Sequence, residues 1–229
     1  MPAFVLGATG FVGREVVRQL CVRGGKPIAH VRPNSRRVKE WSTKLAELGA
    51  IVDNTAWGVS ELAAALQKHR ATELYILIGT TRSQAKAENV SGDIYQEVDF
   101  GLTRMAVDAA KASGLAIRLV YLSSIGADPS ARSAYMKARG QAEDAVRAAG
   151  IPWVIARPSL IVGERDELRI GEKVGAGIGD GVLAVAGLFG GKRLRAKYKS
   201  TSPDVLASAL IRIAEAPEHD RIFDGDDLR

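Results

Sequence analysis

Residues 7–13 of this chain read Gly7-Ala8-Thr9-Gly10-Phe11-Val12-Gly13 and lie between an apolar run and a helical pattern of apolar residues. Gly7 permits a tight exit from a strand, and Gly10 lets the backbone approach a pyrophosphate without a Cβ in the way. Gly13 allows the following helix to pack closely on a sheet, with its N–H groups and positive dipole end facing the phosphates. The stretch therefore predicts a nucleotide-binding turn that uses all seven residues. A glycine-rich turn without a ligand is the alternative.

Length and composition favour a single domain over residues 1–229. The chain has 46% hydrophobic and 25% charged residues, which is typical of a globular protein with a large core. The first expected strand begins almost at Met1, which leaves no room for a signal peptide, and no apolar run approaches the roughly 20 residues of a membrane span. Cys21 is the only cysteine, so it cannot form an internal disulfide. These features predict a cytoplasmic protein.

Short β-rich runs alternate with helical patterns along the chain. Strands are expected near residues 3–6, 27–31, 50–52, 73–78, 118–122 and 153–156. Helices are expected near residues 11–23, 39–48, 60–69, 93–113, 133–149 and 203–216. Strands separated by helices require crossover connections, which favour parallel pairing. The pattern predicts an α/β fold with a Rossmann-like, doubly wound parallel sheet.

Residues 163–200 interrupt this alternation with frequent glycines. In an open α/β sheet, substrates bind outside the carboxyl ends of the strands. A small C-terminal insertion that covers the substrate is one interpretation of this segment. A loosely packed surface loop is the other.

The residues after the second expected strand bear on the choice of cofactor. An acidic residue there would bind the ribose 2′-hydroxyl of NAD, but His30-Val31-Arg32 contains none. The guanidinium of Arg32, with Arg36 and Arg37 behind it, matches a 2′-phosphate in charge and geometry. The sequence therefore favours NADP over NAD, although arginines in a loop are often only solvated surface residues.

Several motifs together resemble a known family. In chain order they are residues 7–13, Gly79-Thr80-Thr81-Arg82, Val98-Asp99, residues 123–128, Tyr135 through Gly140, and Arg157-Pro158. Their order resembles that of the atypical short-chain dehydrogenases/reductases, in the NAD(P)-binding branch that holds the Tat-interacting-protein, or metastasis-suppressor, oxidoreductases. The resemblance covers nearly the whole chain and implies a Rossmann fold, bound NADP(H) and a serine–tyrosine–lysine catalytic group.

The resemblance assigns catalytic roles to particular residues. Tyr135 matches the tyrosine that gives a proton to the substrate oxygen as hydride arrives from the nicotinamide. Ser124 best matches the serine that holds this oxygen, with its neighbour Ser123 as the alternative. Both serines follow an apolar run and so are expected at the carboxyl end of a strand.

Arg139 stands where the family has its lysine. It lies four residues after Tyr135, so both side chains are expected on one helix face, where they could reach the ribose. Arginine keeps the positive charge but does not deprotonate, which puts turnover in doubt more than binding. Lys137 projects from a different face. Asp99 stands where many relatives carry asparagine; it either pairs with Arg139 or lies on the surface.

The remaining cofactor contacts are expected at the ends of other strands. Gly79 and Thr80 should pass beneath the cofactor, and Arg157, Pro158 and Ser159 should lie beside the nicotinamide, mostly through backbone contacts. Pro158 is alternatively only a strand terminator. Asp53 or Asn54 is a further candidate for contact with the adenine.

The chain carries a net charge of +6, and residues 192–199 alternate cations with less polar side chains. If they form a strand, one face could attract an anion, or the charges could only protect a sheet edge. No nucleic-acid-binding motif and no metal-ligand pattern accompanies them. We therefore expect a small-molecule substrate and neither a membrane nor a nucleic acid as partner. A homo-oligomer is compatible with the sequence.

Three hypotheses follow from these residues. The first is an NADP-dependent oxidoreductase that reduces a carbonyl or similar small acceptor, with Tyr135 as the acid, Ser124 as its partner and Arg139 as electrostatic support. The second is an NADP(H)-binding regulator or redox sensor with little or no catalysis, which the loss of the lysine motivates. The third and weakest is a nucleic-acid-associated protein.

Overall fold

The computed structural model describes residues 2–79, 93–162 and 200–229. They contain a seven-stranded sheet in the order β3-β2-β1-β4-β5-β6-β7, and all of its strands run parallel. The strands are β1 (Ala3–Leu6), β2 (Ile28–His30), β3 (Ile51–Asp53), β4 (Glu73–Ile76), β5 (Arg118–Leu122), β6 (Trp153–Arg157) and β7 (Arg221–Asp224). The predicted doubly wound α/β fold is thereby confirmed.

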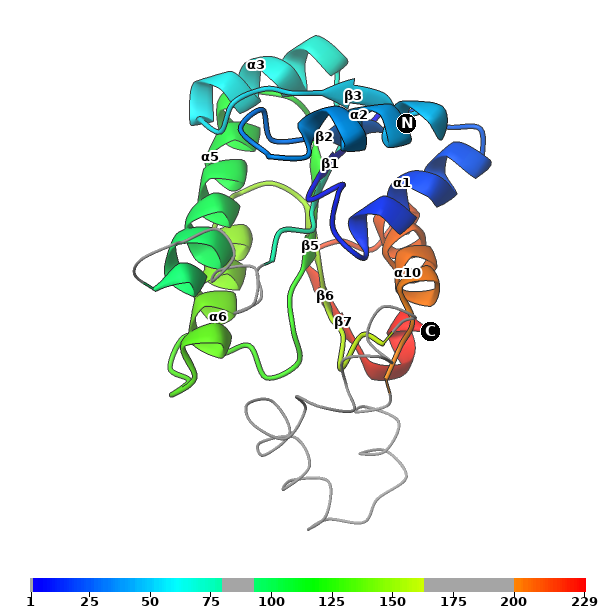
Figure 1. Ribbon diagram of the computed structural model, residues 1–229. Coiled ribbons are helices and arrows are strands. Elements are labelled where there is room, and N and C mark those ends of the chain that lie inside the picture. Colours follow the sequence, from blue (N-terminus) through cyan, green and yellow to red (C-terminus); the bar gives the residue numbers. More distant parts are fainter. Residues whose placement is uncertain (1, 80–92, 163–199) are drawn as a thin grey trace.

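Helices cover both faces of the sheet (Figure 1). One face carries α1 (Gly13–Val22), α2 (Val38–Glu47) and α10 (Pro203–Glu215). The other carries α3 (Val59–His69), the helix η1 (Tyr95–Leu102), α5 (Thr103–Ser113) and α6 (Ala134–Arg147). Each layer buries its own apolar cluster against the sheet, which is why the strands are apolar on both sides. None of the helices in the described ranges has the length and apolar character needed to cross a membrane.

Three elements differ from the sequence-based expectation. The predicted helix over residues 93–113 is divided, because η1 is a π-helix that runs directly into α5. Strand β7 was not predicted. It has four residues and only Phe223 is buried, so its sequence shows no alternation of apolar and polar residues that would indicate a strand. A 3-10 turn, η3 (Gly225–Leu228), follows it.

The order of the strands places the topological switch point of the sheet next to β1. The connection from β1 leads to β2 on one side, whereas β4 lies on the other, so β1 and β4 flank the topological switch point. Gly7 leaves β1 with a φ of +83°, and a Cβ at this position would lie 2.5 Å from the carbonyl oxygen of Leu77. Only glycine fits this crossing of two strand exits.

The same turn brings α1 down onto the sheet. A Cβ added to Gly13, the first residue of α1, would lie 2.1 Å from the carbonyl oxygen of Gly7. Both the tight exit and the close helix packing expected from the glycine spacing are therefore present. The N-terminus of α1 consequently lies at the carboxyl end of β1, beside the exit of β4.

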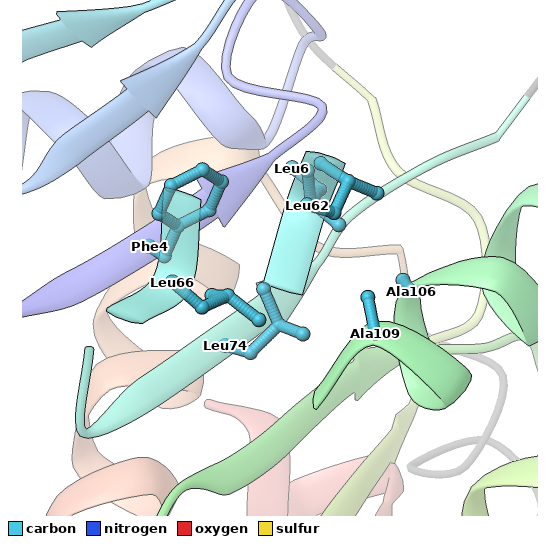
Figure 2. Close-up of a pocket in the computed structure, with 7 residues that line it drawn as sticks. All are labelled: Phe4, Leu6, Leu62, Leu66, Leu74, Ala106 and Ala109. Carbon is cyan, nitrogen blue, oxygen red and sulfur yellow. The ribbon is translucent and has the colours of Figure 1, made fainter. Parts of the chain in front are cut away.

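A gap in the core lies away from this edge. Figure 2 shows its lining, which is apolar throughout and comes from β1, β4, α3 and α5: Phe4, Leu6, Leu62, Leu66, Leu74, Ala106 and Ala109. The gap is too narrow to hold a water molecule. It is a packing gap beside two small alanines and offers a ligand no polar contact.

Adding a methyl group at Gly13 should destabilise the protein. The Gly13→Ala change is expected to lower the free energy of unfolding by about 2 kcal/mol or more, because the Cβ meets rigid backbone. Gly101→Ala is the control, since its Cβ would come no closer than 3.4 Å to another atom. Urea unfolding measures both variants. Equal stability of the two would show that α1 does not depend on this contact.

Candidate functional site

The turn after β1 leaves several backbone donors available. The N–H of Gly10 donates to the carbonyl of Gly7 at 2.9 Å, and the N–H of Arg14 donates to Gly10 at 3.1 Å. Within the described part of the chain, the N–H groups of Phe11, Val12 and Gly13 have no hydrogen-bond acceptor, and no side chain caps the helix. Such donors at a helix start suit phosphate oxygens. The turn therefore fits the pyrophosphate of a dinucleotide.

The exit of β2 carries an arginine and no carboxylate. Arg32 is exposed directly after the strand, as is Arg36, whereas Arg37 pairs with Glu40 at 2.5 Å and stacks on Trp41. Arg32 and Arg36 are therefore the exposed basic residues nearest to the end of β2 along the chain.

The two candidate residues after β3 serve structural roles. The carboxylate of Asp53 accepts the N–H of Thr55 and lies 3.0 Å from His69. The amide of Asn54 donates to the carbonyl of Val31, which joins the exits of β2 and β3. Neither side chain is available for an adenine in this arrangement.

Tyr135 lies in the first turn of α6 against two aromatic or charged neighbours. Its ring centre is 5.4 Å from that of Tyr95, edge to face, and 5.4 Å from the guanidinium carbon of Arg139. Arg139 is one helical turn further along α6, as the spacing predicted. The two residues thus share one face of α6, and the half-buried Tyr135 is held between its neighbours.

Arg139 is buried and engaged in several contacts. Its Nη2 lies 2.8 Å from Oδ1 of Asp99, which is itself completely buried, so the pairing alternative for Asp99 is the one observed. Its Nη1 donates to the carbonyl of Leu122 at 2.7 Å and to the hydroxyl of Tyr121 at 3.3 Å. A Cβ at Gly79 would lie 2.4 Å from Nη2. Arg139 therefore joins β4, β5, η1 and α6 at one point.

These contacts keep Arg139 charged. Burial acts to lower the pKa of its guanidinium, but Tyr121, Tyr135 and Asp99 raise that pKa by more. Burial also raises the pKa of the Tyr121 phenol, and Arg139 partly offsets the effect. Across the physiological range the site thus holds a charged guanidinium next to a neutral phenol on β5.

The two serines after β5 differ in their partners. Ser123 is buried and its hydroxyl donates to Glu143 at 2.6 Å. Ser124 is half-buried, and its hydroxyl makes only a 3.4 Å contact with the carbonyl of Ile125. Of the two hydroxyls, that of Ser124 is therefore the less tightly held by the described residues.

Glu143 was not singled out from the sequence. It is completely buried on α6, and its two carboxylate oxygens accept both Nε and Nη2 of Arg157, at 2.8 and 2.5 Å. The signal that could have found it is its spacing of four from Arg139 on the apolar face of α6. The Arg157 side chain is therefore occupied, so only its backbone is left for a cofactor.

Other predicted contacts have mixed outcomes. Pro158 is buried beyond β6, and its carbonyl accepts the N–H of Ile125, which brings the ends of β5 and β6 together; Ser159 follows it. Thr80, and residues 163–199 of the expected substrate-covering insertion, lie outside the described residues. So does the basic segment 192–199. Within the described ranges, no group of three or more His, Cys, Asp or Glu side chains is placed to hold a metal ion.

Comparison with known proteins identifies the class. Residues 7–179 match the model of the NAD(P)H-binding family, so the chain belongs to that family. It is 30% identical to the protein FMP52, mitochondrial, of Candida albicans over 79% of this chain and 76% of the relative. It is also 30% identical to fmp52, mitochondrial, of Aspergillus niger over 90% and 84%. The finer resemblance to the Tat-interacting-protein branch stays a prediction.

Solved structures with the same fold include reductases. The anaerobillin reductase ChuY of Escherichia coli O157:H7 has a TM-score of 0.64 at 17% identity and covers 100% of this chain and 99% of its own. The Citrobacter triphenylmethane reductase complexed with NADP(H) has a TM-score of 0.61 at 18% identity, over 100% and 73%. MoeE5 in complex with UDP-glucose and NAD has a TM-score of 0.63 at 16% identity, over 100% and 79%. These likenesses show the fold.

The names of the curated relatives correct one expectation. The sequence alone predicted a cytoplasmic protein, but the relatives in Candida albicans and Aspergillus niger are both named mitochondrial. The prediction of a cytoplasmic location is therefore wrong. It relied on composition and on the expectation that no signal peptide precedes the first strand, and neither argument separates cytoplasmic from mitochondrial proteins.

The buried carboxylate of Glu143 should contribute strongly to stability. Glu143→Gln is expected to lower the free energy of unfolding by about 3 kcal/mol, because Arg157 loses its bidentate partner and Ser123 its acceptor. The matched control is Asp144→Asn, the next residue on α6, whose exposed pair with Arg147 should contribute less than about 1 kcal/mol. Urea unfolding compares them, and equal losses would contradict the role of Glu143.

Proposed function

We propose that this protein is an NADP-dependent oxidoreductase that reduces a carbonyl or similar small acceptor by hydride transfer. The observation that carries the proposal is the meeting of two features at one edge of the sheet. The start of α1 offers unbonded N–H groups within the described residues, and the ends of β5 and the start of α6 bring Ser124 and Tyr135 to the same edge. Family membership supports a nicotinamide cofactor.

The residues that would hold the cofactor come from several strand ends. Residues 7–13 would bind the pyrophosphate, Arg32 the 2′-phosphate, and Gly79 with the backbone of residues 157–159 the nicotinamide side. Bound NADPH would supply the hydride and be left as NADP⁺. Arg139 would orient Tyr135 more than bind the ribose, because its Nη1 donates to the carbonyl of Leu122 and its Nη2 pairs with Asp99.

The proton is the part of the reaction that this chain supplies. As the carbonyl carbon gains the hydride, the O–H bond of Tyr135 breaks and its proton passes to the carbonyl oxygen, which gives an alcohol. Ser124 would donate a hydrogen bond to that oxygen and so stabilise its developing negative charge. Tyr135 would then regain a proton from water.

Cofactor preference tests the binding half of the proposal. We expect NADPH to bind more tightly than NADH, and Arg32→Ala to weaken NADPH binding about tenfold, the loss of one charge-assisted hydrogen bond. NADH binding should not change. Isothermal titration calorimetry at one salt concentration gives these affinities, with Arg37→Ala as the control because Arg37 is already paired with Glu40. Tighter NADH binding that Arg32→Ala leaves unchanged would exclude NADP.

Removal of the Tyr135 hydroxyl tests the chemical half. Tyr135→Phe is expected to lower turnover by about 10²–10⁴-fold while cofactor affinity stays the same, because only the proton donor is lost. NADPH oxidation with a panel of quinones, aldehydes and ketones provides the assay. Tyr95→Phe, which changes the neighbouring ring in the same way, is the control. Full activity of Tyr135→Phe would rule out this mechanism.

A second candidate is an NADP(H)-binding regulator or redox sensor without efficient turnover. The observation that favours it is the enclosure of Arg139, whose guanidinium is engaged by Asp99 and Leu122 where the family has a lysine. NADPH binding without any oxidation of NADPH across the acceptor panel would support this candidate.

A further inference from the structure

Two contacts of the same spacing join η1 to α6. Tyr95 meets Tyr135, and Asp99, four residues after Tyr95, meets Arg139, four residues after Tyr135. A hydrogen bond between Gln96 and Gln141 adds to this seam at 3.0 Å. Because η1 is a π-helix with more residues per turn than an α-helix, Tyr95 and Asp99, four residues apart, lie close to one face of it. Tyr135 and its cation are therefore both held by partners on η1.

The carboxylate of Asp99 changes the charge that Tyr135 meets. A lone cation beside a phenol favours the phenolate, which readily takes a proton from an alcohol. Here the cation is Arg139, and a fully buried carboxylate lies 2.8 Å from it on the opposite helix. At such a distance in a buried site, the two charges largely cancel toward their neighbours.

We propose that Asp99 is a positioning residue that holds and neutralises Arg139, so that the guanidinium orients Tyr135 as a proton donor without drawing the proton off the phenol. The assignment of Tyr135 as the proton donor rests on the function proposed above. Arg139 thus orients the tyrosine without strongly promoting loss of its proton. The expected substrate class is an oxidised acceptor such as a ketone, aldehyde or quinone.

The described groups that face Tyr135 can be named from each element. Arg139 comes from α6, Tyr95 and Asp99 come from η1, and Tyr121 comes from β5. Only Asp99 is an acid among them. Changes to Asp99 and Arg139 should therefore move the ionisation of the Tyr135 phenol in opposite directions.

The test follows phenolate formation in the cofactor-free protein by ultraviolet absorbance as pH rises. Each variant is compared with the same variant carrying Tyr135→Phe, which removes the signals of the other tyrosines. We expect Asp99→Asn to move the midpoint of Tyr135 ionisation at least about one pH unit lower, since Arg139 is no longer balanced. Arg139→Gln should move it higher. The double variant should lie between the two.

Asp108→Asn is the matched control. Asp108 pairs with Arg104 at 3.0 Å on the exposed side of α5, so the same acid-to-amide change there should leave the midpoint where it is. Equal midpoints in Asp99→Asn and wild type, or shifts of Asp99→Asn and Arg139→Gln in the same direction, would overturn the proposal. If Asp99→Asn fails to fold, Arg139→Gln is compared with the double variant, whose midpoint should be lower; equal midpoints overturn the proposal.

Turnover separates this inference from the proposed function. In Asp99→Asn the alkaline limit of the pH profile of acceptor reduction should move to lower pH, in step with the absorbance midpoint of Tyr135. If the absorbance midpoints shift as expected but NADPH neither binds nor is oxidised, the proposed function fails and the role of Asp99 stands. If NADPH is oxidised with an acceptor and the midpoints do not respond, the role of Asp99 is wrong.

Discussion

The buried ion pair of Arg139 and Asp99 is the contact on which the site depends. A guanidinium cannot be buried without partners, because the loss of its hydration would cost far more than a single hydrogen bond returns. Asp99 balances the charge, the carbonyl of Leu122 accepts a hydrogen bond, and Gly79 leaves room by having no side chain. The segment after β4, the end of β5, and the helices η1 and α6 are thereby held together next to Tyr135.

Glu143 is a second buried carboxylate, located on α6, and it also connects several elements. Glu143 joins α6 to the ends of β5 and β6 through Ser123 and Arg157. Its carboxylate accepts the hydroxyl of Ser123, the serine nearer the strand, so that Ser124 is the candidate for the substrate contact in the proposed function. Arg139 and Glu143 lie one helical turn apart on the buried face of α6. Both charges can be buried there because each has an oppositely charged partner, Asp99 for Arg139 and Arg157 for Glu143.

Most of the fold could be predicted from the sequence because its signals are local. The glycines at 7, 10 and 13 and the alternation of apolar runs with helical patterns specify a parallel sheet, and six of the seven strands were expected within two residues of their observed ends. Strand β7 was missed because it is short and only one of its side chains is buried. The π-helix was missed because it differs from an α-helix in its hydrogen bonds, which join residues five apart, and the pattern of apolar side chains does not reveal this difference.

The candidate site was predictable in position and less so in its contacts. The end of a strand could be located from the sequence, which placed Ser124, whereas Tyr135 and Arg139 came from the family resemblance and from their spacing of four on one helix. The partners of a buried charge depend on which helix faces it, and so Glu143 was overlooked and Asp99 had two interpretations. The side chains of Asp53 and Asn54 likewise proved to bind the protein itself.

A crystal structure with bound NADP(H) tests the central claim most directly. We predict the pyrophosphate at the N–H groups of residues 11–13, the 2′-phosphate at Arg32, and the Tyr135 hydroxyl directed toward the nicotinamide end. Arg139 should remain paired with Asp99 in that complex. A cofactor bound away from the turn after β1, or a Tyr135 hydroxyl directed away from the nicotinamide, would contradict the account.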